Sequence, residues 1–165
     1  MADEACGSRM TLLENSAMNS SAYDDIVTRY LALLEAGDVD GMAALFSEQG
    51  QVYSPFLGWM SPRPFFAEVV GASGQSRIET LDILVSAQGA PRAIGYFIYH
   101  WQLKDCTFVH FNCADVFDFD ARGRIARMTI VYDTHPVRAQ VGNKYGCLHC
   151  GLGSTTKRHV MRAMR

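Results

Sequence analysis

The sequence predicts an α+β fold in which three helices near the amino terminus pack on one curved antiparallel β-sheet. Two patterns support this prediction. Apolar residues recur at helical spacing in the first part of the chain, and the later part alternates in long strand-like runs separated by short turns. Helices followed by a sheet are typical of the α+β class, and short turns between long strands favour an antiparallel meander. A length of 165 residues, 48% of them hydrophobic, suits one globular domain.

The expected helices each have a recognisable start or end. The first begins at Ser21, which can cap it, and ends at Gly37. A short second helix has Asp40 near its start, and prolines at positions 62 and 64 suit the first turn of a third. The apolar face of the first helix consists of residues three and four apart: Ile26, Val27, Tyr30, Leu31, Leu33 and Leu34.

The sequence predicts five strands. The first, Gln51–Phe56, is stopped by a proline and a glycine, and the other four follow Gly74: Ser76–Gln88, Arg92–Leu103, Thr107–Asp120 and Arg124–Thr134. A curved sheet with helices on one side leaves a concave face. Its apolar and aromatic lining, with a few converging polar groups, is the usual form of a small-molecule site.

The composition limits the classes of partner. Fifteen basic and seventeen acidic residues give a net charge of −2, which argues against nucleic acid. No apolar run approaches the roughly 20 residues of a membrane span, and the acidic start lacks the apolar stretch of a secretory signal. We therefore expect a cytoplasmic protein without membrane attachment, divided into a flexible arm (1–20), one domain (21–138) and a basic extension (139–165).

The cysteines indicate neither disulfides nor a metal centre. Their number, five, is odd and their spacing is irregular, as expected for reduced thiols. Cys147 and Cys150 form a CxxC pair to which His159 could add a third ligand, whereas a closed zinc site needs four. We expect no metal and no cofactor.

Two residues carry the pattern of a polar site in an apolar setting. Tyr30 lies on the apolar face of the first helix, and a buried tyrosine needs a partner for its hydroxyl. Asp115 lies in an apolar strand, where a period of two places it on one face with Phe111, Cys113 and Phe117. Burial there would raise its pKa. The residues alone leave open a core tyrosine bonded to backbone and an aspartate that faces solvent.

Three segments resemble ketosteroid isomerases: residues 28–40 their first helix and turn, 52–56 their first strand, and 114–125 their penultimate strand and turn. On these segments, residues 22–138 are identified as a member of the SnoaL-like, nuclear transport factor 2-like superfamily, closest in pattern to ketosteroid isomerase. The resemblance implies a cone-shaped fold around one apolar pocket, a hydrophobic small-molecule ligand and a homodimer.

The resemblance also implies roles for individual residues. Tyr30 and Asp115 fall where the isomerases keep the tyrosine and the protonated aspartic acid of their oxyanion hole. The isomerases are a standard example of a carboxylic acid that an apolar site keeps neutral. Two such donors stabilise negative charge that develops on a substrate oxygen. The expected substrate-binding residues are Leu34, Ser54, Phe56, Phe97, Met128 and Tyr132.

One position departs from the isomerase pattern. Ser54 stands where the isomerases carry their proton-shuttling aspartate, and serine has no useful basicity at neutral pH. The candidate bases are Glu68, His110 and an activated water. The resemblance places Glu68, on the third helix, in the register of a pocket-lining position of the isomerases. His110 and Asp115 are five residues apart, so an unbroken strand directs them to opposite faces, whereas a bulge would bring both inside.

The expected function is a cofactor-independent isomerase or cyclase-type enzyme acting on a polycyclic or polyketide-like carbonyl compound. Two alternatives remain open. One is a non-catalytic module that binds a hydrophobic ligand, which the missing base favours. The other is a dehydratase similar to scytalone dehydratase, which would need His100 or His110 in the cavity. A limonene-epoxide-hydrolase-like site lacks its second carboxylate, since Ile130 stands at the matching position.

Overall fold

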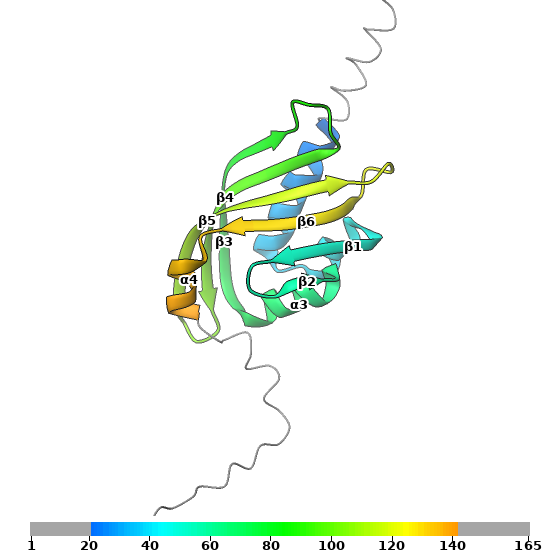
Figure 1. Cartoon of the computed structure of the whole chain (residues 1–165). Helices are drawn as coiled ribbons and strands as arrows, with labels where there is room; N and C mark the ends of the chain where they lie inside the picture. Colours follow the sequence, from blue (N-terminus) through cyan, green and yellow to red (C-terminus); the bar gives the residue numbers. More distant parts are fainter. Residues whose placement is uncertain (1–20, 142–165) are drawn as a thin grey trace, which may run out of the picture.

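A computed structural model describes residues 21–141 of the chain and confirms the α+β prediction. Six strands form one curved sheet in the order β2-β1-β6-β5-β4-β3. Figure 1 shows the N-terminal helix, in blue, crossing behind this sheet, and α4 at the end of β6. The helices are residues 21–36, α2 (Val39–Ala44), α3 (Pro62–Ala72) and α4 (Thr134–Val141). The strands are β1 (Phe46–Ser54), β2 (Gly58–Met60), β3 (Ser73–Val85), β4 (Arg92–Leu103), β5 (Phe108–Phe119) and β6 (Ile125–Tyr132).

The helix ends follow from local chemistry. Gly37 has a φ of +67°, a left-handed conformation that glycine adopts without strain, and it ends the N-terminal helix as expected. The side chain of Asp38 then accepts a hydrogen bond of 2.8 Å from the backbone N–H of Gly41 and caps α2. Pro62 opens α3, as the sequence predicted.

The strands β3 to β6 form the expected antiparallel meander. Buried and less buried residues alternate along β4, so every second side chain points toward the helices. Three features of the first part of the sheet differ from expectation. The strand β1 begins at Phe46, five residues early, and pairs in parallel with β6, and a short β2 forms a hairpin with it. A register shift between Phe46 and Gln51 breaks the alternation that would have revealed the early start.

The N-terminal helix lies close against the sheet at Gly95 of β4. A Cβ atom at this position would lie only 3.0 Å from Cγ1 of Val27. Gly95 is also the cross-strand partner of Asp115 on β5. The missing side chain therefore lets the helix lie against the sheet beside Asp115, which matters for the site described below.

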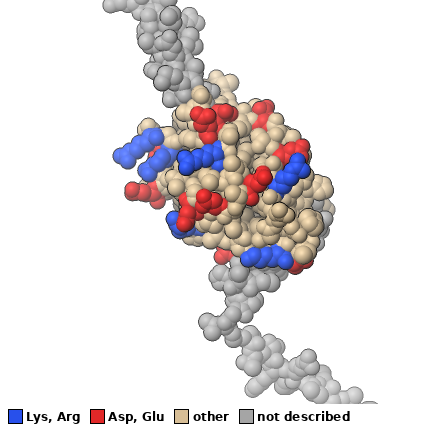
Figure 2. All heavy atoms as spheres, turned by 180° about the vertical axis from the view of Figure 1, so that it is seen from behind, with Lys and Arg blue, Asp and Glu red and all other residues tan. Residues whose placement is uncertain are grey.

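The surface seen from behind in Figure 2 carries acidic and basic side chains intermixed. Within residues 21–141, none of the helices has both the length and the apolar character needed to cross a membrane.

Candidate functional site

The centre of the concave face is a buried hydrogen-bonded pair, Tyr30 and Asp115. The Tyr30 hydroxyl donates to Oδ2 of Asp115 over 2.9 Å. The Cys113 thiol donates to the other oxygen, Oδ1, over 3.3 Å. Tyr30 is 1% exposed and Asp115 is 2% exposed. The hydrogen-bond donors to the two carboxylate oxygens are therefore protein groups and not bulk water. The side chain of Asp115 is thus held in one orientation by a helix and by its own strand.

Burial changes the acidity of both partners. It raises the pKa of Asp115 to about 6, although the hydrogen bonds from Tyr30 and Cys113 act in the opposite direction. Burial, and then the charge of Asp115, raise the pKa of Tyr30 well above its ordinary value. Near neutral pH the carboxyl group therefore exists in both protonation states, while Tyr30 stays a neutral donor. A group of this kind can accept and return a proton.

The pair lies in a pocket with mostly apolar walls, with about 480 Å³ of empty space including its opening to solvent. Asp115 is the one carboxylate among the described residues that line it, and no histidine of the described chain lines it. The walls are Tyr30, Leu34, Ser54, Phe65, Val69, Phe97, Tyr99, Trp101, Phe111, Cys113, Asp115, Ile130 and Tyr132.

The other polar groups of the wall include the hydroxyls of Ser54, Tyr99 and Tyr132. The Tyr99 hydroxyl is 3.2 Å from Oγ of Ser76. Oγ of Ser54 accepts a hydrogen bond of 3.3 Å from the backbone N–H of Phe56. Burial raises the pKa of both tyrosines. These groups can hold a ligand by hydrogen bonds, but none of them is a base near pH 7.

Most of the expected site residues meet at this pocket. Tyr30, Asp115, Leu34, Ser54, Phe97 and Tyr132 all line it. Two expected wall residues do not. Phe56 stacks on the Tyr132 ring, with centroids 6.3 Å apart, from outside the lining. Met128 is fully buried and is paired with Phe117 across β5 and β6, so it belongs to the core.

The expectation that Glu68 lines the pocket is wrong. Its neighbours on α3, Phe65 and Val69, are buried in the pocket wall, whereas Glu68 is half-buried and absent from the wall. A helix turns about 100° per residue, so residues 65 and 69 share a face and residue 68 points to its side.

His110 also lies away from the pocket. The ladder between β4 and β5 is continuous, without a bulge between His110 and Asp115, so the two point to opposite faces. His110 is exposed and stands opposite His100, with ring centroids 6.4 Å apart. His100 in turn lies 3.4 Å from a carboxylate oxygen of Glu79. Neither histidine meets the requirement of the dehydratase alternative.

Sequence reasoning did not assign seven of the wall residues: Phe65, Val69, Tyr99, Trp101, Phe111, Cys113 and Ile130. The signal for most of them was present. Once Phe97 is assigned to the inner face of β4, a period of two also places residues 99 and 101 there. The same rule had already placed residues 113 and 111 on the face of Asp115, without naming them as wall residues.

No three His, Cys, Asp or Glu side chains within residues 21–141 lie close enough to hold a metal ion. The residues of the CxxC hypothesis, Cys147, Cys150 and His159, lie outside the described part of the chain.

Comparison with solved structures finds the same fold in proteins of low sequence identity. SalBIII, an epoxide hydrolase/cyclase-like enzyme with a role in pyran ring formation in the polyether salinomycin, superposes with a TM-score of 0.59 at 22% identity, over 69% of this chain and 92% of that one. Bal32a, from a soil-derived mobile gene cassette, gives a TM-score of 0.63 at 20% identity, over 74% and 98%. A search of curated proteins finds no significant match.

The family comparison covers most of the domain that carries the pocket. The model of the SnoaL-like domain matches residues 27–128, which include Tyr30, Ser54 and Asp115. This match spans more than half of the 165 residues, and it agrees with the cone of helices and curved sheet described above. The chain therefore belongs to the family of SnoaL-like domains.

Proposed function

We propose that the protein is a cofactor-independent enzyme of the isomerase or cyclase type, in which Tyr30 and Asp115 act on the reacting oxygen atoms of a hydrophobic carbonyl compound. The observation that carries this proposal is the buried hydrogen bond of 2.9 Å between the two side chains, at the wall of an apolar pocket. An apolar site strengthens the interaction of such donors with charge that develops during a reaction. The SnoaL-like family and the cyclase-like character of SalBIII support the same reaction class.

The choice of groups in the pocket favours a cyclase-type step over a ketosteroid-isomerase-like one. An isomerase needs a base at the carbon and a separate donor at the oxygen, and Ser54 replaces that base. An intramolecular addition of a hydroxyl to a carbonyl needs no base at a carbon atom. It needs a group that takes the hydroxyl proton and a donor at the carbonyl oxygen. A hydroxyl of the substrate gives its proton to the Asp115 carboxylate as its oxygen bonds to the carbonyl carbon. Tyr30 gives its proton to the carbonyl oxygen, and Asp115 returns one to Tyr30 along their hydrogen bond.

This step conserves protons and leaves both side chains as they began. It requires Asp115 to be ionised at the start, which a pKa of about 6 permits at neutral pH. The mostly apolar and aromatic walls favour a hydrophobic substrate body, which a polyketide-like or polycyclic compound would supply.

A second candidate is a non-catalytic module that binds a hydrophobic ligand. The observation in its favour is the composition of the wall, where Asp115 is the one described group able to take up a proton near neutral pH. Such a module would use Tyr30 and Asp115 only to recognise a polar group on the ligand.

Ring–chain exchange of 4-(2-hydroxyphenyl)butan-2-one separates the two candidates, because this hydroxyketone forms its cyclic hemiketal by the proposed step. The exchange rate would be measured by NMR magnetisation transfer with wild type, Tyr30→Phe and Asp115→Asn. The cyclase proposal predicts acceleration by wild type and loss of most of it, about 10²-fold or more, in either variant. Saturable binding of the compound without acceleration would favour the module.

A further inference from the structure

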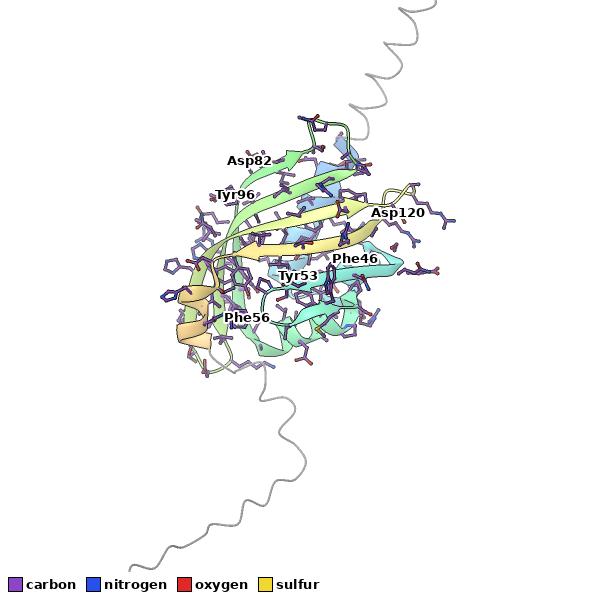
Figure 3. The ribbon with its side chains drawn as sticks, viewed as in Figure 1. Phe46, Tyr53, Phe56, Asp82, Tyr96 and Asp120 are labelled. Carbon is purple, nitrogen blue, oxygen red and sulfur yellow. The ribbon has the colours of Figure 1, made fainter. Side chains whose placement is uncertain are left out.

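A cation lies at the outer end of the pocket wall, on α4. The guanidinium carbon of Arg138 is 4.8 Å from the ring centroid of Phe56. Phe56, labelled in Figure 3 beside α4, stacks on Tyr132 with an angle of 10° between the rings. Tyr132 lines the pocket, so the order from solvent inward is Arg138, Phe56, Tyr132.

The charge of Arg138 is felt inside the pocket. Burial raises the pKa of the Tyr132 hydroxyl, and the Arg138 guanidinium opposes that rise. Asp115, which has the one carboxylate among the described wall residues, acts on the same hydroxyl in the opposite direction and raises its pKa.

No carboxylate within residues 21–141 forms an ion pair with Arg138, which is exposed. Its Nε donates to Oγ1 of Thr134 over 3.3 Å, one turn earlier on α4. Asp133, the nearest carboxylate along the chain, accepts instead from the backbone N–H of His135. Two other arginines show the contrast, since Arg92 and Arg127 share Asp118. Arg138 is thus held over an aromatic ring with its charge not neutralised.

We propose that Arg138 binds a carboxylate carried by the ligand, on the outer side of Phe56 and Tyr132. This inference rests on the proposed function, which places the reacting oxygen atoms at Tyr30 and Asp115. The ligand is then an apolar body with an oxygen at one end and a carboxylate at the other. A guanidinium matches the two oxygens of a carboxylate, and an ionised Asp115 repels a carboxylate that enters in the reverse direction. The two charges together fix the orientation of the ligand.

Three probes with one ring system test the assignment: 6-hydroxy-2-naphthoic acid, its methyl ester and 2-naphthol. Their affinities would be measured by fluorescence titration at low salt. Wild type should bind the acid about 3- to 10-fold more tightly than the ester, and added salt should reduce this preference. Arg138→Gln should abolish the preference and leave the affinity for 2-naphthol unchanged. Arg138→Lys keeps the charge without the planar fork and should retain part of the preference.

Arg122→Gln is the matched control. Arg122 is an exposed arginine in the turn between β5 and β6, so the substitution makes the same change in net charge. It should leave all three affinities unchanged. Equal binding of acid and ester by wild type, a preference that survives Arg138→Gln, or failure of all three probes to bind would overturn the proposal.

Variants of the reacting pair distinguish this proposal from the proposed function. Tyr30→Phe and Asp115→Asn should weaken all three probes alike, because each carries the hydroxyl. If these variants bind as wild type does while Arg138→Gln still removes the preference for the acid, the anion site stands and the role of Tyr30 and Asp115 fails. If Tyr30→Phe and Asp115→Asn weaken all three probes while Arg138→Gln keeps the preference for the acid, the anion site fails and the role of Tyr30 and Asp115 stands.

Discussion

The ionisation of Asp115 should make the folded protein less stable as the pH rises through the weakly acidic range. Burial raises the pKa of this group from 3.8 to about 6, a difference of about two units. At 1.36 kcal/mol per unit, the difference corresponds to about 3 kcal/mol of unfolding free energy. The folded state holds the proton more tightly than the unfolded state. This contribution is therefore complete below about pH 4 and is lost as the pH rises to about 6.

Urea unfolding of wild type and Asp115→Asn between pH 4 and 7.5 isolates this contribution, because the other titrating groups are common to both proteins. Relative to that of Asp115→Asn, the unfolding free energy of wild type should rise by about 3 kcal/mol when the pH falls from 7 to 4. Tyr30→Phe removes a donor that stabilises the carboxylate. Since a hydrogen bond to a charged group contributes about 1.5–3 kcal/mol, the transition should move up by about one to two pH units.

The exposed Asp82 of β3 provides the control substitution, Asp82→Asn. The difference in unfolding free energy between this variant and wild type should not change by about 3 kcal/mol when the pH falls from 7 to 4. A difference between wild type and Asp115→Asn that stays constant from pH 4 to 7 would refute the reasoning, since Asp115 would then titrate alike in both states. An unchanged transition in Tyr30→Phe would show that the hydrogen bond does not control it.

Three further predictions concern the framework around the site. Gly95→Ala places a Cβ 3.0 Å from Val27 and should reduce the unfolding free energy, measured by urea unfolding, by about 1–3 kcal/mol. An unchanged unfolding free energy would mean that the N-terminal helix shifts away from the sheet without cost. His110→Gln should leave naphthol affinity within about twofold of wild type at pH 6 and 8, because the ring faces away from the pocket; a larger change would contradict that placement. Tyr99→Phe removes the contact with Ser76 and should lower stability by about 1 kcal/mol, and an unchanged midpoint would show that this contact contributes nothing.

Local patterns in the sequence were sufficient where the structure is determined locally. The bounds expected for β4, Arg92–Leu103, are those of the structure, because turn residues flank a regular alternation. The end of the first helix at Gly37 was predicted for a similar reason, since the left-handed conformation needed there is one that glycine adopts readily. The period of two predicted that His110 faces away from Asp115 if the strand is unbroken, and the strand has no bulge between them.

Contacts between distant segments were beyond these patterns. Tyr30 and Asp115 are 85 residues apart, and only the resemblance to ketosteroid isomerases brought them together before the structure did. Gly95 carried no signal of its own, although its missing side chain lets the helix reach the sheet. Glu68 was misplaced by a single step along α3, since a rotation of about 100° separates a wall residue from its neighbour.

The most direct test of the account is an absorbance titration of 2-naphthol with wild type, Tyr30→Phe and Asp115→Asn near neutral pH. The central claim is that these two side chains together bind the reacting oxygen atoms of the ligand. It predicts that bound naphthol absorbs as the naphtholate well below its own pKa, because its proton is shared with the pair, and that either substitution weakens binding about tenfold or more. Binding that both substitutions leave unchanged would contradict the claim.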